Sequence, residues 1–279
     1  MIKKYFKWFF RVIAENFEYK KLQKFSNTLF MTSSDDLTIM TFNIRRDCIE
    51  DENYNWQYRK ENIIKMIKQY SPDIICMQEV MPHMAKYLIY QLGNYYDSVG
   101  LESFTCGDLT RSWCFFGEGL LTFYKKNKFT LKSTDCIKLF DGRKINIRRA
   151  SVLKLFDSKE NTYDIINIHF CHKDRYCRKQ SFEKILKYIN DRNITNAFIA
   201  GDFNCEPSWP NNGVELFLNN FYHNMPDKKG SINNFKESDN NITIDFVFSN
   251  KHLIKSEVIR DQYDIKYLSD HYPILCHYN

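Results

Sequence analysis

The segment Ala-Phe-Ile-Ala-Gly-Asp-Phe-Asn-Cys-Glu-Pro occupies residues 197–207 and is the most informative part of the chain. Its first four residues are apolar and predict a short buried strand, which the polar residues after it bring to an end. Asp202 and Asn204 stand two positions apart, so in an extended chain both side chains point to the same side. A carboxylate suits a hard cation such as Mg²⁺, and a neutral amide can donate to a phosphate. One short segment thus supplies both kinds of group.

Similar polar residues occur elsewhere at positions where an apolar, β-like run ends or turns. They are Asn43, Glu79, His169, Asp245, and Asp270 with His271. Strand ends of a layered sheet can converge on one pocket, so these side chains are candidates for a single site. Each one also has an ordinary explanation, because Asn43 can cap a turn, Glu79 can pair with a lysine and Asp202 can begin an Asx-turn.

Short β-like runs alternate with amphipathic helices from about residue 36 onward, without a repeat or a Pro/Gly-rich linker. The pattern predicts strands at 37–43, 73–79, 120–124, 129–138, 148–156, 163–169, 197–200, 243–249 and 272–277. It predicts helices at 56–70 and around 182–189. The four runs between residues 120 and 169 indicate an antiparallel meander. Because strands outnumber helices, we expect an α+β fold with stacked sheets and one catalytic domain over residues 36–279.

The composition indicates a globular protein with a modest preference for anionic partners. The 279 residues are 43% hydrophobic and can bury a sizeable core. No stretch approaches the roughly 20 apolar residues that a membrane span needs. The charge of +6 favours nucleic acid or an anionic membrane surface. The nine cysteines include no C-x-x-C pair, which indicates buried thiols in a reducing cytoplasm.

Residues 1–35 form a basic, aromatic extension before the predicted domain. Lysines and an arginine interrupt its apolar positions, which excludes the core of a signal peptide. The apolar residues that recur at helical spacing are Ile2, Phe6, Phe9, Ile13 and Phe17. A helix over residues 1–25 could lie on an anionic membrane as a peripheral contact, or it could pack on the domain, and the sequence leaves both alternatives open.

Six segments, taken in order, resemble the motifs of the endonuclease/exonuclease/phosphatase superfamily, the DNase I-like phosphohydrolases. They are Thr41-Phe-Asn-Ile, Pro72-Asp-Ile-Ile-Cys-Met-Gln-Glu, Ile168-His169, Gly201-Asp-Phe-Asn, Ile244-Asp245 and Ser269-Asp-His. The resemblance implies a four-layered α/β sandwich, in which helices flank two central sheets and the site lies at one edge of the sheets. The nearest likeness is to a poorly characterised branch of small hydrolases, which usually shows Asp where this chain has Cys171.

Hydrolysis of a phosphoester needs a water attacking in line, a base for it, and donors for the charge that develops on the phosphoryl oxygens. We expect Glu79 to be the principal Mg²⁺ ligand, with Asn43 and Asp270 close to the ion or its waters and Mn²⁺ as a substitute. A zinc site is disfavoured because the His/Cys grouping that zinc prefers is missing.

Asp202 is our candidate for activating the water, and Asn204 for donating to the phosphate or the water. We expect His169 and His271 to donate to phosphoryl oxygens. Like the corresponding aspartate of the family, Asp245 is expected to orient the ring of His271 and to favour its charged form. Further candidates for binding substrate phosphates, with ordinary ion pairs as the alternative, are Arg45, Arg149, His172 and Arg178.

These expectations describe a Mg²⁺-dependent phosphoester hydrolase that acts on phosphodiester or phosphomonoester bonds. A nuclease or phosphodiesterase of nucleic acid comes first, because of the charge and because aromatic residues such as Phe203 and Trp209 could stack on bases. The alternative is a phosphatase or phosphodiesterase of a phosphoinositide, another lipid or a small phosphoester. A catalytically silent binding module is a third hypothesis. We expect a cytoplasmic monomer, with peripheral membrane contact as an option.

Overall fold

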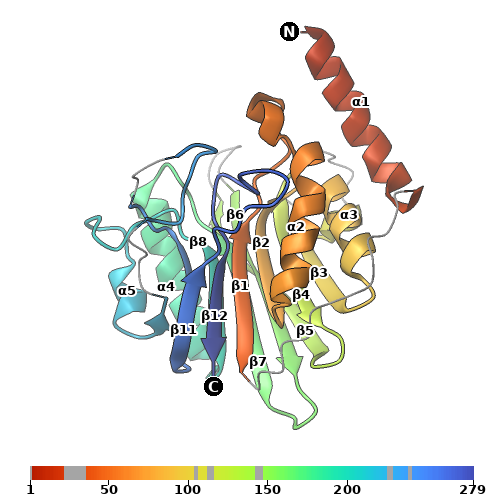
Figure 1. Cartoon of the computed structure of the whole chain (residues 1–279). Coiled ribbons are helices and arrows are strands. Elements are labelled where there is room, and N and C mark those ends of the chain that lie inside the picture. The colour runs from red at the N-terminus through yellow and green to blue at the C-terminus, as the bar shows by residue number, and fades with distance from the viewer. Residues whose placement is uncertain are drawn as a thin grey trace.

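Two six-stranded sheets pack face to face in the computed structural model, with helices on their outer faces (Figure 1). The structure describes residues 2–21, 36–103, 106–111, 116–141, 147–224, 229–237 and 241–279. The strand order is β11-β12-β1-β2-β4-β3 in the first sheet and β5-β6-β7-β8-β10-β9 in the second. This is the four-layered α/β sandwich that the motifs imply.

The elements have the following bounds. The first sheet contains β1 (Leu37–Asn43), β2 (Ile74–Val80), β3 (Tyr96–Glu102), β4 (Gly119–Lys125), β11 (Leu253–Val258) and β12 (Ile274–Tyr278). The second contains β5 (Thr130–Asp141), β6 (Ile147–Phe156), β7 (Thr162–His169), β8 (Ala197–Asp202), β9 (Tyr222–His223) and β10 (Asp245–Ser249). The helices are α1 (Ile2–Glu18), α2 (Trp56–Tyr70), α3 (Pro82–Leu92), α4 (Arg175–Asp191) and α5 (Glu215–Leu218). Short 3₁₀ turns are η1 (Tyr19–Lys21), η2 (Ile49–Tyr54) and η3 (Leu109–Arg111).

Most of these elements lie where the sequence predicts them, and β1 and α2 have the predicted bounds. The predicted meander is correct for β5, β6 and β7, which pair antiparallel in that order. It is wrong for β4, which joins the first sheet between β2 and β3. The helix α3 and the strands β3 and β11 are additional elements that the periodicity does not indicate.

Three apolar layers hold the sandwich together. Between the sheets lie side chains such as Ile39 and Phe198, both fully buried. The outer face of the first sheet is covered by α2 and α3 through residues such as Ile63 and Met84, and α4 covers the second sheet around Phe182. Because β1 and β8 are covered on both faces, every one of their residues is buried, which fits the apolar run Ala197–Ala200 of β8.

The two parallel strand pairs bring the functional residues to one end of the molecule. In the first sheet β1 runs parallel to β2, and in the second β7 runs parallel to β8. Asn43 pairs with Gln78, next to Glu79, and His169 pairs with Asp202. Parallel neighbours end at the same edge of a sheet, so four of the predicted site residues meet there.

A buried polar bridge joins the two sheets close to that edge. The Gln78 amide donates to Asn167 Oδ1 at 2.9 Å, and Asn167 Nδ2 donates to the Met77 carbonyl and to Thr122 Oγ1, each at 3.1 Å. Gln78 and Asn167 are both fully buried. Because these bonds satisfy groups that water cannot reach, they favour a single relative position of the sheets.

The helix α1 stands beside α3, and its N-terminus extends beyond the end of the sheets where β1 and β2 finish (Figure 1). Its contacts with the domain are both apolar, through the fully buried Val12 and the ring of Trp8 on Phe116, and polar. Arg11 donates to both carboxylate oxygens of Asp47 at 2.8 Å, and Lys60 bonds to Glu15 at 3.0 Å. No helix among the described residues has the length and hydropathy to cross a bilayer.

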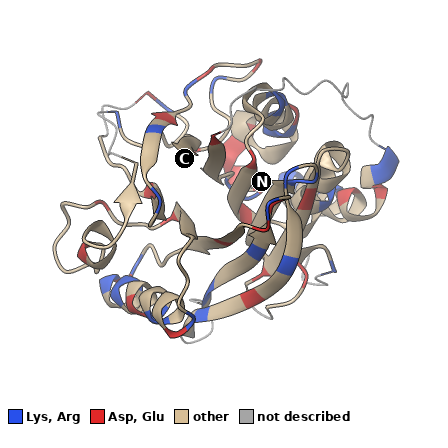
Figure 2. Cartoon of the chain, turned by 90° about the horizontal axis from the view of Figure 1, so that it is seen from below, with Lys and Arg blue, Asp and Glu red and all other residues tan. Residues whose placement is uncertain are grey.

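Charged residues and thiols are distributed over the described part of the chain. At the end of the molecule opposite the site, basic and acidic residues are interspersed along strands and helices (Figure 2). The described cysteines form no disulfide and are mostly buried. Cys106 and Cys136 are half-buried, and their sulfur atoms lie 2.7 Å apart.

Candidate active site

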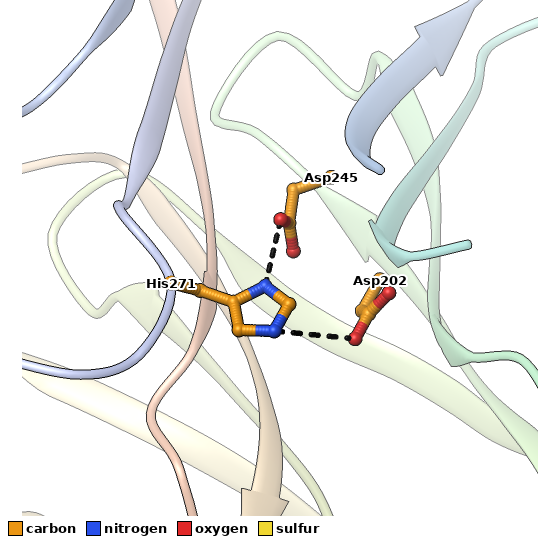
Figure 3. Close-up of side chains that lie close together, drawn as sticks. All are labelled: Asp202, Asp245 and His271. Atoms are coloured by element: carbon orange, nitrogen blue, oxygen red, sulfur yellow. Dashed lines mark hydrogen bonds and ion pairs between the residues drawn. The ribbon is translucent and has the colours of Figure 1, made fainter. Parts of the chain in front are cut away.

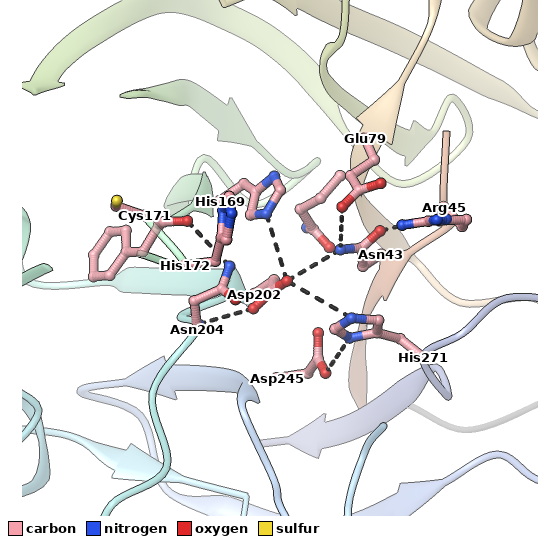
Figure 4. A network of polar contacts seen from close by, with 12 residues as sticks. Asn43, Arg45, Glu79, His169, Cys171, His172, Asp202, Asn204, Asp245 and His271 are labelled. Atoms are coloured by element: carbon pink, nitrogen blue, oxygen red, sulfur yellow. Dashed lines mark hydrogen bonds and ion pairs between the residues drawn. The ribbon is translucent and has the colours of Figure 1, made fainter. Parts of the chain in front are cut away.

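Asp202 is the centre of the predicted site, at the end of β8 (Figure 4). Its Oδ2 accepts a hydrogen bond from Asn43 Nδ2 at 3.0 Å, and its Oδ1 accepts one from the backbone N–H of Asn204 at 2.8 Å. The same Oδ2 lies 3.5 Å from His169 Nε2 and 3.9 Å from His271 Nε2. The structure thus brings together side chains that are up to 228 positions apart in numbering, from Asn43 to His271.

The end of β8 and the turn after it depend on the backbone conformations of Gly201 and Asn204. A Cβ atom on Gly201 would lie 2.1 Å from the Ile168 carbonyl oxygen, so only glycine allows β7 and β8 to approach so closely. Asn204 has a φ of 51°, a left-handed conformation that asparagine tolerates. Its Nδ2 donates to the Phe170 carbonyl at 3.1 Å, which holds the loop after β7 against the turn. Phe203 is fully buried, so it belongs to the core and is not available to stack on a base.

His271 is held between two carboxylates (Figure 3). Its Nδ1 lies 2.8 Å from Asp245 Oδ2, the oxygen to which Ser231 Oγ also donates at 2.6 Å. Burial by itself would lower the pKa of His271, but the charges of Asp245 and Asp202 and the hydrogen bond from the ring raise it well above its usual value. His271 is therefore a charged imidazolium at neutral pH, as the sequence analysis expects.

His169 has the opposite character. Burial, and then the nearby charge of Arg148, lower the pKa of His169 to about 4. Its ring is therefore neutral at neutral pH and can donate through one nitrogen only. The site thus presents one charged and one neutral imidazole on either side of Asp202, whose own pKa is raised by burial and by Asp245.

Glu79 faces Asp202 from β2 and carries a backbone φ of 59°. Its carboxylate accepts from Asn43 Nδ2 at 3.3 Å and from the Arg46 backbone N–H at 3.2 Å. Burial would raise the pKa of Glu79, but His169, the Arg46 N–H and Arg45 lower it to about 2. The carboxylate is therefore ionised, and a buried carboxylate charge favours a cation beside it.

The residues around Glu79 fit a hard divalent cation. Asp270 adds a second carboxylate at the same edge, 3.5 Å from an Arg45 nitrogen. Asn43 lies beside Glu79 and turns its amide nitrogen toward it, while its oxygen accepts the Arg45 N–H at 3.1 Å. Carboxylate oxygens suit Mg²⁺ or Mn²⁺. Asp202, Asp245 and His271 also lie close enough to share an ion, with ligand atoms within 4.8 Å of one another. We favour the Glu79 side, because the Nδ1 of His271 is already bonded to Asp245.

Three of the four predicted phosphate ligands are engaged within the protein. Arg45 binds Asp51 through two nitrogens at 3.0 and 3.1 Å, at the border of the site. Arg178 donates to the Cys171 carbonyl at 2.8 Å and so supports the loop after β7. Arg149 is buried and donates to the Phe140 carbonyl at 3.2 Å, so the structure does not bring it to the other site residues. The Cys171 side chain is fully buried.

Arg148 is a site residue that the sequence analysis missed. Its guanidinium nitrogens lie 3.5 Å from His169 Nδ1 and 3.5 Å from Nδ1 of the exposed His172. Successive residues of a strand point to opposite faces, so on β6 Arg148 faces the site while Arg149 faces away from it. Glu118 lies just before β4, and burial and the charge of Glu79 raise its pKa to about 7.

With this geometry in place, the family is clear. The model of the Endonuclease/Exonuclease/phosphatase family matches residues 40–271, and the chain belongs to this family. Members of the family are phosphoester hydrolases and generally depend on a divalent metal. The chain is accordingly an enzyme of this class.

Particular relatives are similar to parts of the chain. A probable CCR4-Not complex 3'-5'-exoribonuclease subunit Ccr4 from Vairimorpha ceranae is 27% identical over an alignment of 194 residues that covers 59% of this chain and 39% of the relative. Protein angel homolog 2 from Danio rerio is 25% identical over an alignment of 201 residues that covers 63% of this chain and 34% of the relative. The match thus spans well under half of these curated relatives. An endonuclease/exonuclease/phosphatase crystal structure from Bacteroides vulgatus superposes with a TM-score of 0.76 at 25% identity, covering 88% of this chain and 99% of that one.

Proposed function

We propose that residues 36–279 form a Mg²⁺-dependent phosphodiesterase that hydrolyses single-stranded nucleic acid, RNA before DNA, by in-line attack of a water. The observation that carries the proposal is the position of Asp202 between a neutral imidazole, His169, and a charged one, His271. A site that must take a proton from water and also balance negative charge on phosphoryl oxygens needs groups of these two kinds.

The protein's own groups have distinct tasks in this reaction. Asp202 orients the attacking water and accepts its proton, while the Asn43 amide and the Asn204 N–H hold the carboxylate in position. His271, charged and fixed by Asp245, donates to a phosphoryl oxygen as negative charge develops. His169 donates through its one N–H, and Arg148 beside it balances the charge of the substrate phosphate.

Glu79 would hold the metal ion, with Asp270 at the same edge and Asn43, which donates to Glu79, beside the ion or its waters. When bound, Mg²⁺ supplies positive charge that polarises the phosphoester and stabilises the developing anion. Mn²⁺ prefers the same oxygen ligands and is expected to substitute for it.

The preference for RNA comes from two sources outside the catalytic residues. The relative from Vairimorpha ceranae is described as a probable 3'-5'-exoribonuclease subunit, although only 39% of it is matched. The net charge of +6 favours a polyanion. The same catalytic groups could also cleave a monoester or a lipid phosphodiester, so the substrate has to be tested directly.

The test is metal-dependent hydrolysis by the full chain across a panel of substrates. The panel contains single-stranded RNA, single-stranded DNA, abasic duplex DNA, phosphoinositides and small phosphoesters, each with Mg²⁺, with Mn²⁺ and with EDTA. The variants are Glu79→Gln and Asp202→Asn, which keep the size of each side chain but remove its charge. We expect cleavage of single-stranded RNA in Mg²⁺, a loss of about 10²-fold or more in both variants, and none in EDTA.

The outcomes separate the alternatives. Preferential hydrolysis of phosphoinositides or small phosphoesters, abolished by the same variants, would keep the site assignment but replace the substrate. Absence of hydrolysis on all classes, with folding verified by circular dichroism, would favour the binding-module hypothesis. RNA cleavage that survives Glu79→Gln and Asp202→Asn would contradict the site itself.

A further inference from the structure

We propose that α1 is a membrane-docking helix whose aromatic face binds the surface of an anionic lipid bilayer. The proposal concerns a surface outside the catalytic site, so it does not depend on which phosphoester the enzyme hydrolyses.

The outward face of α1 is aromatic. Phe6, Phe10 and Phe17 are 59%, 62% and 68% exposed, the first two in ring contact at 6.4 Å between centroids. They stand four and seven positions apart, so they lie along one side of the helix. Large exposed apolar residues that gather in one continuous patch, rather than singly, mark an interaction surface.

The opposite face of the helix is turned toward the domain and makes several polar contacts with it. Arg11 bonds to Asp47, Glu15 accepts from Lys60, and the Lys86 ammonium donates to the side-chain and backbone oxygens of Asn16, each at 3.2 Å. The fully buried Val12 and the ring of Trp8, which contacts Phe116, add an apolar part to this attachment. Phe6 and Phe10 stay mostly exposed and are presented to a partner, whereas the exposed ring of Phe17 also lies 5.9 Å from the Lys86 ammonium.

The charges around the aromatic face select an anionic partner. The exposed charged residues of α1 and η1 are Lys3, Lys4, Lys7, Glu18, Lys20 and Lys21. Five of these six are lysines, and the acidic one, Glu18, is bonded to Lys21 at 2.8 Å. A helix with lysines beside an aromatic side is the pattern of a helix that lies in the interface of an anionic membrane.

The position of α1 would direct the catalytic end toward such a surface. Its N-terminal half projects past the end of the sheets that carries the site (Figure 1). Trp8 and Phe9 both contact the ring of Phe116 at 5.4 Å, two residues before Glu118. Tyr5 donates to Glu50 at 2.8 Å, and Arg46, whose N–H binds Glu79, lines the same cavity of about 390 Å³ as Tyr5. The helix is thus attached directly beside the site.

The experiment measures binding of the full chain to vesicles of phosphatidylcholine, with and without phosphatidylserine, by co-sedimentation. The test variant is Phe6→Ser/Phe10→Ser/Phe17→Ser. The matched control is Tyr176→Ser/Tyr222→Ser/Ile254→Ser, which removes equally exposed apolar side chains elsewhere. A charge variant, Lys3→Glu/Lys7→Glu, separates the electrostatic from the apolar contribution.

We expect the wild type and the control to bind phosphatidylserine vesicles, and the triple phenylalanine variant to bind about 10²-fold more weakly. The charge variant should lose about tenfold or more, and high salt should weaken the wild type similarly. Glu79→Gln should bind like the wild type, which separates this test from that of catalysis.

Unchanged vesicle binding in the phenylalanine variant would overturn the proposal. A second result would also overturn it: the wild type does not bind vesicles and sediments as a dimer, while the phenylalanine variant sediments as a monomer. In that case the aromatic face would bind a second copy of the chain.

Discussion

Asp245 acts on the reaction through the ring of His271, so its removal has a distinctive signature. We expect Asp245→Asn to lower kcat about 10²-fold with little change in KM. The carboxylate raises the pKa of His271 well above its usual value, so the ring keeps its proton through neutral pH. Without the carboxylate the pKa falls, and the alkaline limb of the pH–rate profile should move to lower pH. An unmoved alkaline limb, with Asp157→Asn as the surface control, would show that His271 is not the group titrating.

Arg148 provides a second test at the scale of single residues. We expect Arg148→Ala to reduce kcat/KM about tenfold or more, because a charge beside the substrate phosphate is lost. Burial and the charge of Arg148 together lower the pKa of His169 to about 4. The variant removes the charge of Arg148, so the pKa of His169 should rise. NMR titration of the His169 ring measures the shift. Lys154→Ala on the same strand is the control, and an unchanged titration would argue against the contact.

The two arginines also show where sequence reasoning ends. The strand-end pattern places Asn43, Glu79, His169, Asp202, Asp245 and His271 in one cluster, as the structure confirms. It cannot decide between Arg148 and Arg149, because neighbouring residues on a strand face opposite sides and both are basic. Which of the two arginines faces the site depends on the register in which β6 pairs with β5 and β7. That register is set by the tertiary structure.

At the scale of elements, the contact between β7 and β8 leaves no room beside Gly201. We expect Gly201→Ala to reduce the free energy of unfolding by about 2–3 kcal/mol, because the new methyl group would meet the Ile168 carbonyl at 2.1 Å unless the strands part. Urea unfolding measures the change in the free energy of unfolding. The kcat of the folded variant should also fall, since His169 and Asp202 stand at the ends of these two strands. A fully stable, fully active variant would contradict the close approach.

Arg59 of α2 connects two loops that carry site residues. Its fully buried guanidinium donates to the carbonyls of Arg45 and Leu268, both at 2.9 Å. We expect Arg59→Met to cost about 3 kcal/mol of stability, since several buried carbonyls lose their donor. The neighbouring exposed residue gives the control, Gln57→Met. Equal unfolding midpoints for the two variants would mean that the guanidinium contributes little.

Other elements were difficult to predict for reasons that the structure makes plain. Most residues of α3 are buried, so its sequence lacks the one-sided periodicity of a surface helix. Strand β11 is at the sheet edge and mostly exposed, and its polar residues resemble a loop. The strand β4 belongs to the first sheet because it pairs with β2, which lies about 40 residues earlier. The local sequence of β4 does not indicate this pairing.

For the whole molecule, metal binding should appear as stability. A ligand that binds only the folded state raises the melting temperature with its concentration. We expect Mg²⁺ to raise the Tm of the wild type, EDTA to reverse the shift, and Glu79→Gln to abolish it, in a thermal-shift assay without substrate. Glu183→Gln, an exposed acid on α4, is the control. A shift that persists in Glu79→Gln would move the metal away from Glu79, with the Asp202, Asp245 and His271 group as the next candidate.

The pairing of β1 with β12 has a consequence for the order in which the protein matures. The first strand of the sandwich lies between β2 and β12, and its Leu37 pairs with Tyr278, 241 positions further along the sequence. Asn43 can therefore meet Asp202 and His271 only after the segments that carry them have been synthesised. Pairing over such sequence separations makes folding slow and leaves β1 exposed to other partners meanwhile. A nascent chain that has not yet released β12 should thus lack an assembled catalytic site.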